Sequence, residues 1–174
     1  MHSFHRASVL IVPLALAACA SGMKAPEAPA AVTPPAHAKY NMTTVGVGEI
    51  TYECRAKAGA AGAFEWVFVA PVATLYDGDK KAVGKYYGGP TWEANDGSKV
   101  TGKQLAVAPA AGTGNIPFQL VQANPAMGSG AMTGVTYIQR LNTMGGVAPT
   151  AACAQGNMGA KQLVKYQADY VFYK

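Results

Sequence analysis

The residues best suited to chemistry lie in one short glycine-rich stretch, "YYGGPTWEANDGSKVTG", at positions 86–102. It places aromatic rings beside carboxylates, a combination that suits stacking on a sugar or an apolar molecule. Two readings of Trp92 stay open, a ligand platform and a core plug under a loop, and Asp96 before Gly97 is ordinary turn chemistry. The candidate ligand-binding residues are Tyr86, Tyr87, Trp92, Asp96 and Ser98.

Charged side chains surround this stretch. Acidic residues cluster around two turns that flank Tyr86 and Tyr87, and aspartate beside glycine is ordinary turn chemistry. A cation site and a pair of opposed catalytic carboxylates are the functional alternatives, and the second predicts a hydrolase acting on envelope glycans. The acidic residues are Asp77, Asp79, Glu93 and Asp96, and the basic residues expected near such a site or on a solvated face are Lys85, Lys99 and Arg140.

Several chemistries are excluded by residue content. The three histidines, His2, His5 and His37, all precede residue 40, so the remainder has no imidazole for a Ser-His-Asp triad or a zinc or copper site. Gly46-Val47-Gly48 is followed by no third glycine and no helical pattern, which argues against a dinucleotide. We therefore expect no metal and no cofactor. The formal net charge is +5, but the lysines and arginines are scattered, which predicts no nucleic-acid partner.

The N-terminus resembles a bacterial lipoprotein signal. Histidines and Arg6 precede an apolar run of about 12 residues, whereas a bilayer core needs about 20. The run ends in Leu16-Ala17-Ala18-Cys19, which is similar to the sequence cleaved before a lipidated cysteine; ordinary cleavage after Ala20 is the alternative. We expect residues 1–18 to be the signal peptide and Cys19 to carry the lipid. Because alanine rather than aspartate follows Cys19, we expect the outer membrane, facing the periplasm or the cell surface.

The rest of the chain divides into a tether and one domain. Residues 19–39 are rich in alanine and proline and have no hydrophobic period, which predicts an extended, disordered tether. The single folded domain is expected over residues 40–174. It keeps two cysteines, Cys54 and Cys153, which in an exported chain predict one disulfide. Neither has a CxxC neighbour or a nearby histidine, so we expect no metal role for them.

The hydrophobic pattern of the domain is that of strands. Glycine and proline recur, apolar residues alternate with polar ones over short runs, and no segment has a convincing helical period. About seven or eight such runs, separated by turn clusters, predict an all-β fold, either an antiparallel β-sandwich or a closed β-barrel with one disulfide. The clearest run is "LVKYQADYVFYK" at 163–174, where one face carries Val164, Tyr166, Ala168, Tyr170 and Phe172.

Three sequence blocks together resemble a known family. They are "VGKYYGGPTWEANDGSKVTG" at 83–102, "RLNTMGGVAPTAAC" at 140–153 and "VKYQADYVFY" at 164–173. The chain is similar, over residues 46–173, to the family called domain of unknown function 3455, whose members are mostly exported proteins of bacteria and fungi. The resemblance implies that Cys54 and Cys153 are a structural pair. It implies no particular activity, and the dehydrogenase label of some members has no support in these residues.

The functional expectation is a binding or structural role in the cell envelope rather than catalysis. The membrane would be reached through the N-terminal lipid, and a glycan or a small apolar molecule would be the ligand. The rival function is the carboxylate-dependent glycan hydrolase, for which Asp96 would be indispensable.

Overall fold

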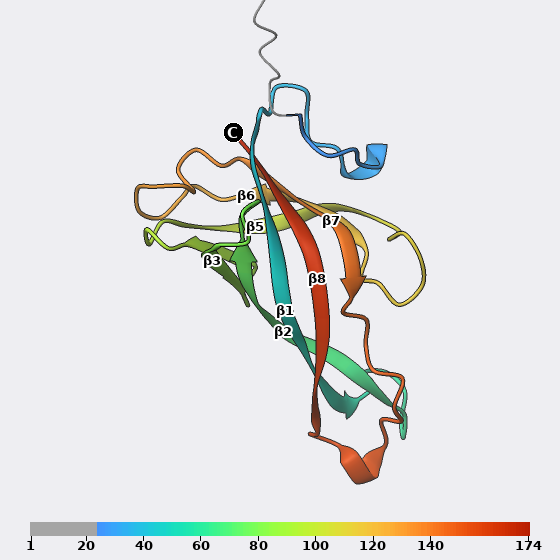
Figure 1. Ribbon diagram of the computed structural model, residues 1–174. Helices are drawn as coiled ribbons and strands as arrows, with labels where there is room; N and C mark the ends of the chain where they lie inside the picture. Colours follow the sequence, from blue (N-terminus) through green and yellow to red (C-terminus); the bar gives the residue numbers. More distant parts are fainter. Residues whose placement is uncertain (1–23) are drawn as a thin grey trace, which may run out of the picture.

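The computed structural model describes residues 24–174, whose strands close into one antiparallel barrel (Figure 1). Each strand pairs with the next in the chain, and the last pairs with the first, which confirms the all-β prediction and selects the barrel over the sandwich. Neither of the two short 3-10 helices in this part of the chain is long and apolar enough to cross a membrane. The elements are η1 Ala30–Val32, β1 Tyr40–Ala56, β2 Phe64–Tyr76, β3 Ala82–Tyr87, β4 Thr91–Ala94, β5 Lys99–Ala108, β6 Phe118–Ala123, β7 Tyr137–Gly145, η2 Gln155–Asn157 and β8 Lys161–Tyr173.

Strand β8 follows the predicted alternation. Tyr166, Ala168, Tyr170 and Phe172 are buried in the interior of the barrel, as one face of a strand should be. Val171 points to the other face, yet it is also fully buried, in a second cluster outside the barrel. The nearly continuous apolar end of β8 is therefore explained by burial on both faces.

The outer cluster is completed by the segment that precedes β1. Residues 24–39, which we expected to be part of a disordered tether, instead lie against the barrel, and Val32 of η1 is fully buried. The carbonyl of Val32 accepts a 2.6 Å hydrogen bond from Nε2 of Gln139 on β7. This correction has a simple cause, because Val32 gives an alanine- and proline-rich segment a buried anchor on the outside of the barrel, in a cluster with residues of β5, β6, β7 and β8. Figure 1 shows the segment in blue at the end of the barrel away from η2.

Close packing inside the barrel explains the glycines at the middle of β1. A Cβ at Gly46 would lie 2.5 Å from Cε2 of Tyr170, and a Cβ at Gly48 would lie 2.0 Å from the carbonyl oxygen of Val72. The Gly46-Val47-Gly48 sequence thus makes room for the Tyr170 ring and for strand β2 rather than for a phosphate.

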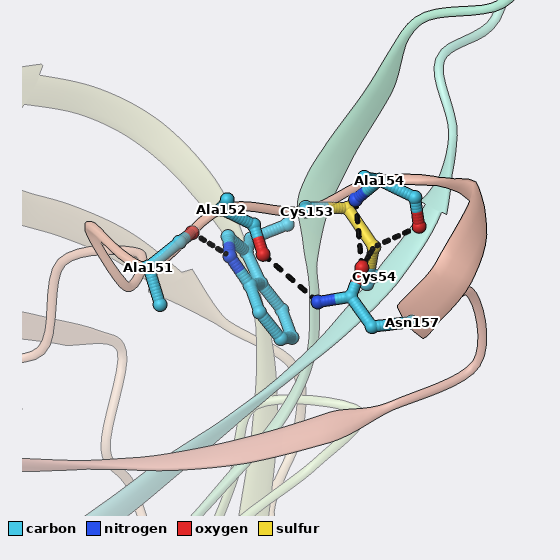
Figure 2. Close-up of a disulfide and its surroundings, with 7 residues drawn as sticks. Cys54, Ala151, Ala152, Cys153, Ala154 and Asn157 are labelled. Carbon is cyan, nitrogen blue, oxygen red and sulfur yellow. Dashed lines mark hydrogen bonds between the residues drawn. A yellow bond between two sulfur atoms is a disulfide. The ribbon is translucent and has the colours of Figure 1, made fainter.

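The far end of the barrel is tied by the predicted disulfide. Strands β1, β2 and β8 run past the other strands towards η2 (Figure 1), and Cys54 of β1 is bonded there to Cys153 in the loop before β8. Figure 2 shows Asn157 bracing this loop: its side-chain amide donates to the carbonyl of Ala152, and its Oδ1 accepts from the Ala154 amide. From β2, the indole N–H of Trp66 donates to the Ala151 carbonyl over 2.8 Å.

Candidate functional site

The five predicted site residues do not form one site. Tyr86 of β3 and Trp92 of β4 are direct partners across the hairpin, and both rings point into the barrel, stacked with centroids 4.8 Å apart. Tyr170 of β8 packs edge-on against Trp92 at 5.7 Å. Trp92 is only 1% exposed, so it is a core residue on a strand and presents no face to solvent. This corrects the idea of an exposed tryptophan platform in a loop.

Asp96 and Ser98 form a latch between two loops. One carboxylate oxygen of Asp96 accepts hydrogen bonds from the hydroxyl and amide of Ser98 (2.6 and 2.8 Å), and the other accepts from the amide of Ala131 (2.8 Å). The Ser98 hydroxyl in turn accepts from the Met132 amide. The Ser98 hydroxyl first, and then the Ala131 and Ser98 amides, hold the pKa of Asp96 below its usual value. The Met132 side chain is buried in the barrel core, so the latch holds this side chain, which we call the plug, in place.

The loop residue that meets this latch must be glycine. Gly130 has a φ of +153°, and a Cβ there would lie 2.2 Å from the carboxylate of Asp96. The glycine-rich "AMGSGAMTG" segment at 126–134 therefore permits a close approach to Asp96, which gives that acid a structural role.

Two other acidic residues of the cluster, Glu93 and Asp77, also have local partners. Tyr87 donates a 2.6 Å hydrogen bond to Glu93, whose second oxygen pairs with Lys85 at 3.2 Å. The Tyr87 hydroxyl first, and Lys85 second, lower the pKa of Glu93. Asp77 accepts from the amides of its own turn at Asp79 and Lys81. Among the described residues, no three or more histidines, cysteines or acids come together in a way that could hold a metal ion.

The structure has a pocket that the sequence reasoning did not anticipate. It has a volume of about 340 Å³ and lies between β1, β2 and the β5–β7 side of the barrel. Its apolar wall includes Ile50, Phe68 and Ile116, and Tyr52 and Tyr86 contribute rings. Phe68 is 53% exposed, so its ring is accessible to a ligand. Of the five predicted site residues, only Tyr86 lines this pocket.

Arg140 is the cation of the pocket. It lies on β7 opposite Tyr170, on the same face as Ile138, which is fully buried in the barrel core. Its Nε and Nη2 both donate to the carbonyl of Pro117, at 3.1 and 2.9 Å. The alternation in "TYIQRL" was the available signal, because it puts Arg140 two residues from Ile138 on one face of the strand.

Burial changes the ionisation of the tyrosines around this pocket. Desolvation is the main cause of a raised pKa at Tyr52, Tyr86, Tyr166 and Tyr170, and the positive charge of Arg140 opposes it at each. The hydroxyls of Tyr166 and Tyr170 lie 3.2 Å apart, so each phenol also has a polar partner inside the barrel. The interior of the barrel therefore favours the neutral form of these tyrosine side chains.

These pKa shifts predict alkaline unfolding. Unfolded tyrosine loses its proton near pH 10, whereas the buried phenols keep theirs to higher pH. Above about pH 10 the folded state then binds more protons than the unfolded state, so stability falls as pH rises and is unaffected by these groups at lower pH. We expect the thermal midpoint to drop above about pH 10, with the last phenolate absorbance appearing together with unfolding. Ionisation of all nine tyrosines with an intact near-ultraviolet circular dichroism spectrum would contradict this.

The comparisons with known proteins identify the family. No curated protein and no solved structure matches the chain. A family model described as "Protein of unknown function (DUF3455)" matches residues 34–174, which takes in all eight strands and both cysteines of the disulfide. The match confirms the resemblance seen in the sequence blocks, and the chain belongs to the DUF3455 family of proteins of unknown function.

Proposed function

We propose that this chain is an exported, lipid-anchored domain of the bacterial cell envelope that binds a small, largely apolar molecule. The observation that carries the binding role is the pocket beside Phe68, because its wall combines apolar side chains with polar groups from Gln104, Gln119 and Arg140. Its volume of about 340 Å³ is at the lower end of the range typical of small-molecule sites. A ligand of one to three aromatic rings, or a short acyl chain, suits this size.

The envelope location is supported by two features of the chain. Leu16-Ala17-Ala18-Cys19 has the form of a lipoprotein processing site, although these residues lie outside the described part of the structure. The Cys54–Cys153 disulfide suits an oxidising compartment such as the periplasm. Lipid attachment at Cys19 to the outer membrane, facing the periplasm or the cell surface, remains part of the proposal.

Binding is favoured over glycan hydrolysis by where the carboxylates lie. A two-carboxylate mechanism needs an acid and a second carboxylate on either side of the scissile bond. No aspartate or glutamate is among the described residues that line the pocket. Asp77, Glu93 and Asp96 are instead held by turn amides, by Tyr87 with Lys85, and by the latch.

The binding role is tested with a neutral apolar dye, N-phenyl-1-naphthylamine, whose emission rises in an apolar site. We expect the purified chain to bind the dye, and Phe68→Ala to weaken binding by about tenfold because it removes the exposed ring at the rim. The matched control is Leu163→Ala, which truncates a comparably exposed apolar side chain (63%) on β8, away from the pocket. No dye binding, or equal losses in the two variants, would refute the proposed pocket function.

A further inference from the structure

We infer that the pocket selects a monocarboxylate with an apolar body, and that Arg140 is the residue that binds the carboxylate. The inference rests on the proposed binding function and specifies the ligand class for the same pocket. It depends on three features: the charge balance of Arg140, the hydrogen-bonding groups beside it, and the apolar wall opposite.

The charge of Arg140 is uncompensated within the described chain. The ion pairs there are Arg55–Glu53, Lys57–Glu65 and Lys85–Glu93, and none includes Arg140. A guanidinium has five N–H donors, and in this structure only Nε and Nη2 have a protein acceptor, the Pro117 carbonyl. That contact fixes the plane of the guanidinium and leaves donors for a ligand. An arginine placed on the core face of β7 needs an anion more than a surface arginine does, because partial burial weakens its solvation.

Two glutamines extend the polar side of the pocket. The side-chain N–H of Gln119 donates to the side-chain oxygen of Gln104 over 2.5 Å, and both residues line the pocket with Arg140. This bond leaves the amide group of Gln104 as a donor and the oxygen of Gln119 as an acceptor. The hydroxyl proton of Tyr52 is not free to bind a ligand, since it is donated to the carbonyl of Gly146 over 2.7 Å.

The rest of the wall decides which anion fits. Arg140 is the one cation among the described residues lining the pocket, so it balances a single negative charge; a phosphomonoester, with nearly two, would be undercompensated. A carboxylate also matches the planar fork of guanidinium donors. Ile50, Phe68 and Ile116 provide the surface for an aromatic or aliphatic body. A free sugar has neither a charge to pair with Arg140 nor an extended apolar body to pack against the apolar wall, so it fits this pocket poorly.

The test compares two probes with the same ring and nearly the same shape, the anion 2-naphthoate and its neutral amide, 2-naphthamide. By calorimetric titration of the purified full chain, with its disulfide intact, we expect the carboxylate to bind at least about tenfold tighter than the amide. Arg140→Gln is expected to abolish this preference, because it weakens binding of the carboxylate much more than binding of the amide. Arg55→Gln is the matched control, because it removes a cation from an exposed pair outside the pocket, and it should keep the full preference.

Each outcome separates this inference from the proposed function. Equal binding of the two probes by the wild type, or a preference that survives Arg140→Gln, overturns the role of Arg140 but leaves apolar binding standing. Failure of the wild type to bind either naphthalene probe or the neutral dye overturns both. Circular dichroism checks that Arg140→Gln is folded; if it is not, Arg140→Met repeats the comparison, and the wild-type preference alone decides whether the pocket selects carboxylates.

Discussion

Replacing both Cys54 and Cys153 by alanine is expected to lower the free energy of unfolding by about 4 kcal/mol. The disulfide joins residues separated by 99 positions, and a cross-link over so long a loop removes much of the entropy of the unfolded chain. It also ties the end of β1 to the loop before β8, where β1, β2 and β8 extend past the shorter strands (Figures 1 and 2). Chemical denaturation followed by far-ultraviolet circular dichroism measures the loss.

Two controls distinguish the cross-link from local packing at that end. Reduction of the wild type with a thiol should give most of the same loss, because it opens the bond without removing side-chain atoms. Trp66→Phe removes the indole hydrogen bond to the Ala151 carbonyl in the same loop and part of the ring, and should cost about 1 kcal/mol. If reduced and oxidised wild type unfold at the same denaturant concentration, the disulfide does not stabilise the fold.

The fold class could be predicted from the sequence because the alternation of apolar and polar residues within each strand is a local pattern. Alternation along β8 placed Tyr166, Ala168, Tyr170 and Phe172 on one face, and they fill the barrel interior. The choice between sandwich and barrel was not local, since it depends on β8 pairing with β1 rather than ending at an edge. The two strands are far apart in the chain, and no motif in either specifies its partner.

The candidate site was harder to predict for the same reason. The turn formers around Trp92 correctly indicated tight turns, but they hid a four-residue strand, β4, whose inward side is set by its register with β3 and β5. The partner of Asp96 is the amide of Ala131, 35 residues away, and a backbone amide has no sequence signature. Arg140 was recognised only as a basic neighbour, because its place in a pocket depends on loops at Gly88–Pro90 and at Ile116 and Pro117.

Composition also gave a wrong prediction for the segment before β1. Its alanines and prolines predicted a tether, but Val32 is fully buried, and Ala25, Ala28 and Ala38 also pack against the outside of the barrel. Tyr173 supplies a second contact, since its hydroxyl donates to Gln139, the residue that also bonds the Val32 carbonyl. The segment therefore covers part of the outer face of β7, where Gln139 is hydrogen-bonded and Leu141 packs in the outer cluster.

Trp92→Ala is expected to be the most destabilising single substitution in the barrel, at about 4 kcal/mol. The indole is fully buried, stacks on Tyr86 at 4.8 Å and meets Tyr170 edge-on, so truncation leaves a large cavity and two unsupported rings. Met132, which the Asp96–Ser98 latch holds in place, belongs to the same core cluster, so loosening should reach that loop. Urea unfolding measures the loss, and the near-ultraviolet circular dichroism of the tyrosines reports whether the remaining rings stay fixed.

Trp92→Phe separates ring packing from the polar atom of the indole. The Nε1 of Trp92 is buried and has no hydrogen-bond partner among the described residues, so tryptophan already carries the cost of an unsatisfied donor. Phenylalanine removes that donor and keeps an aromatic face for Tyr86, so we expect a loss below about 2 kcal/mol. An equal loss in the two variants would mean that the indole N–H has a partner, such as a buried water, that stabilises the core. A loss below about 1 kcal/mol for Trp92→Ala would instead show that Trp92 is not a core residue, and would reopen its role as a ligand contact.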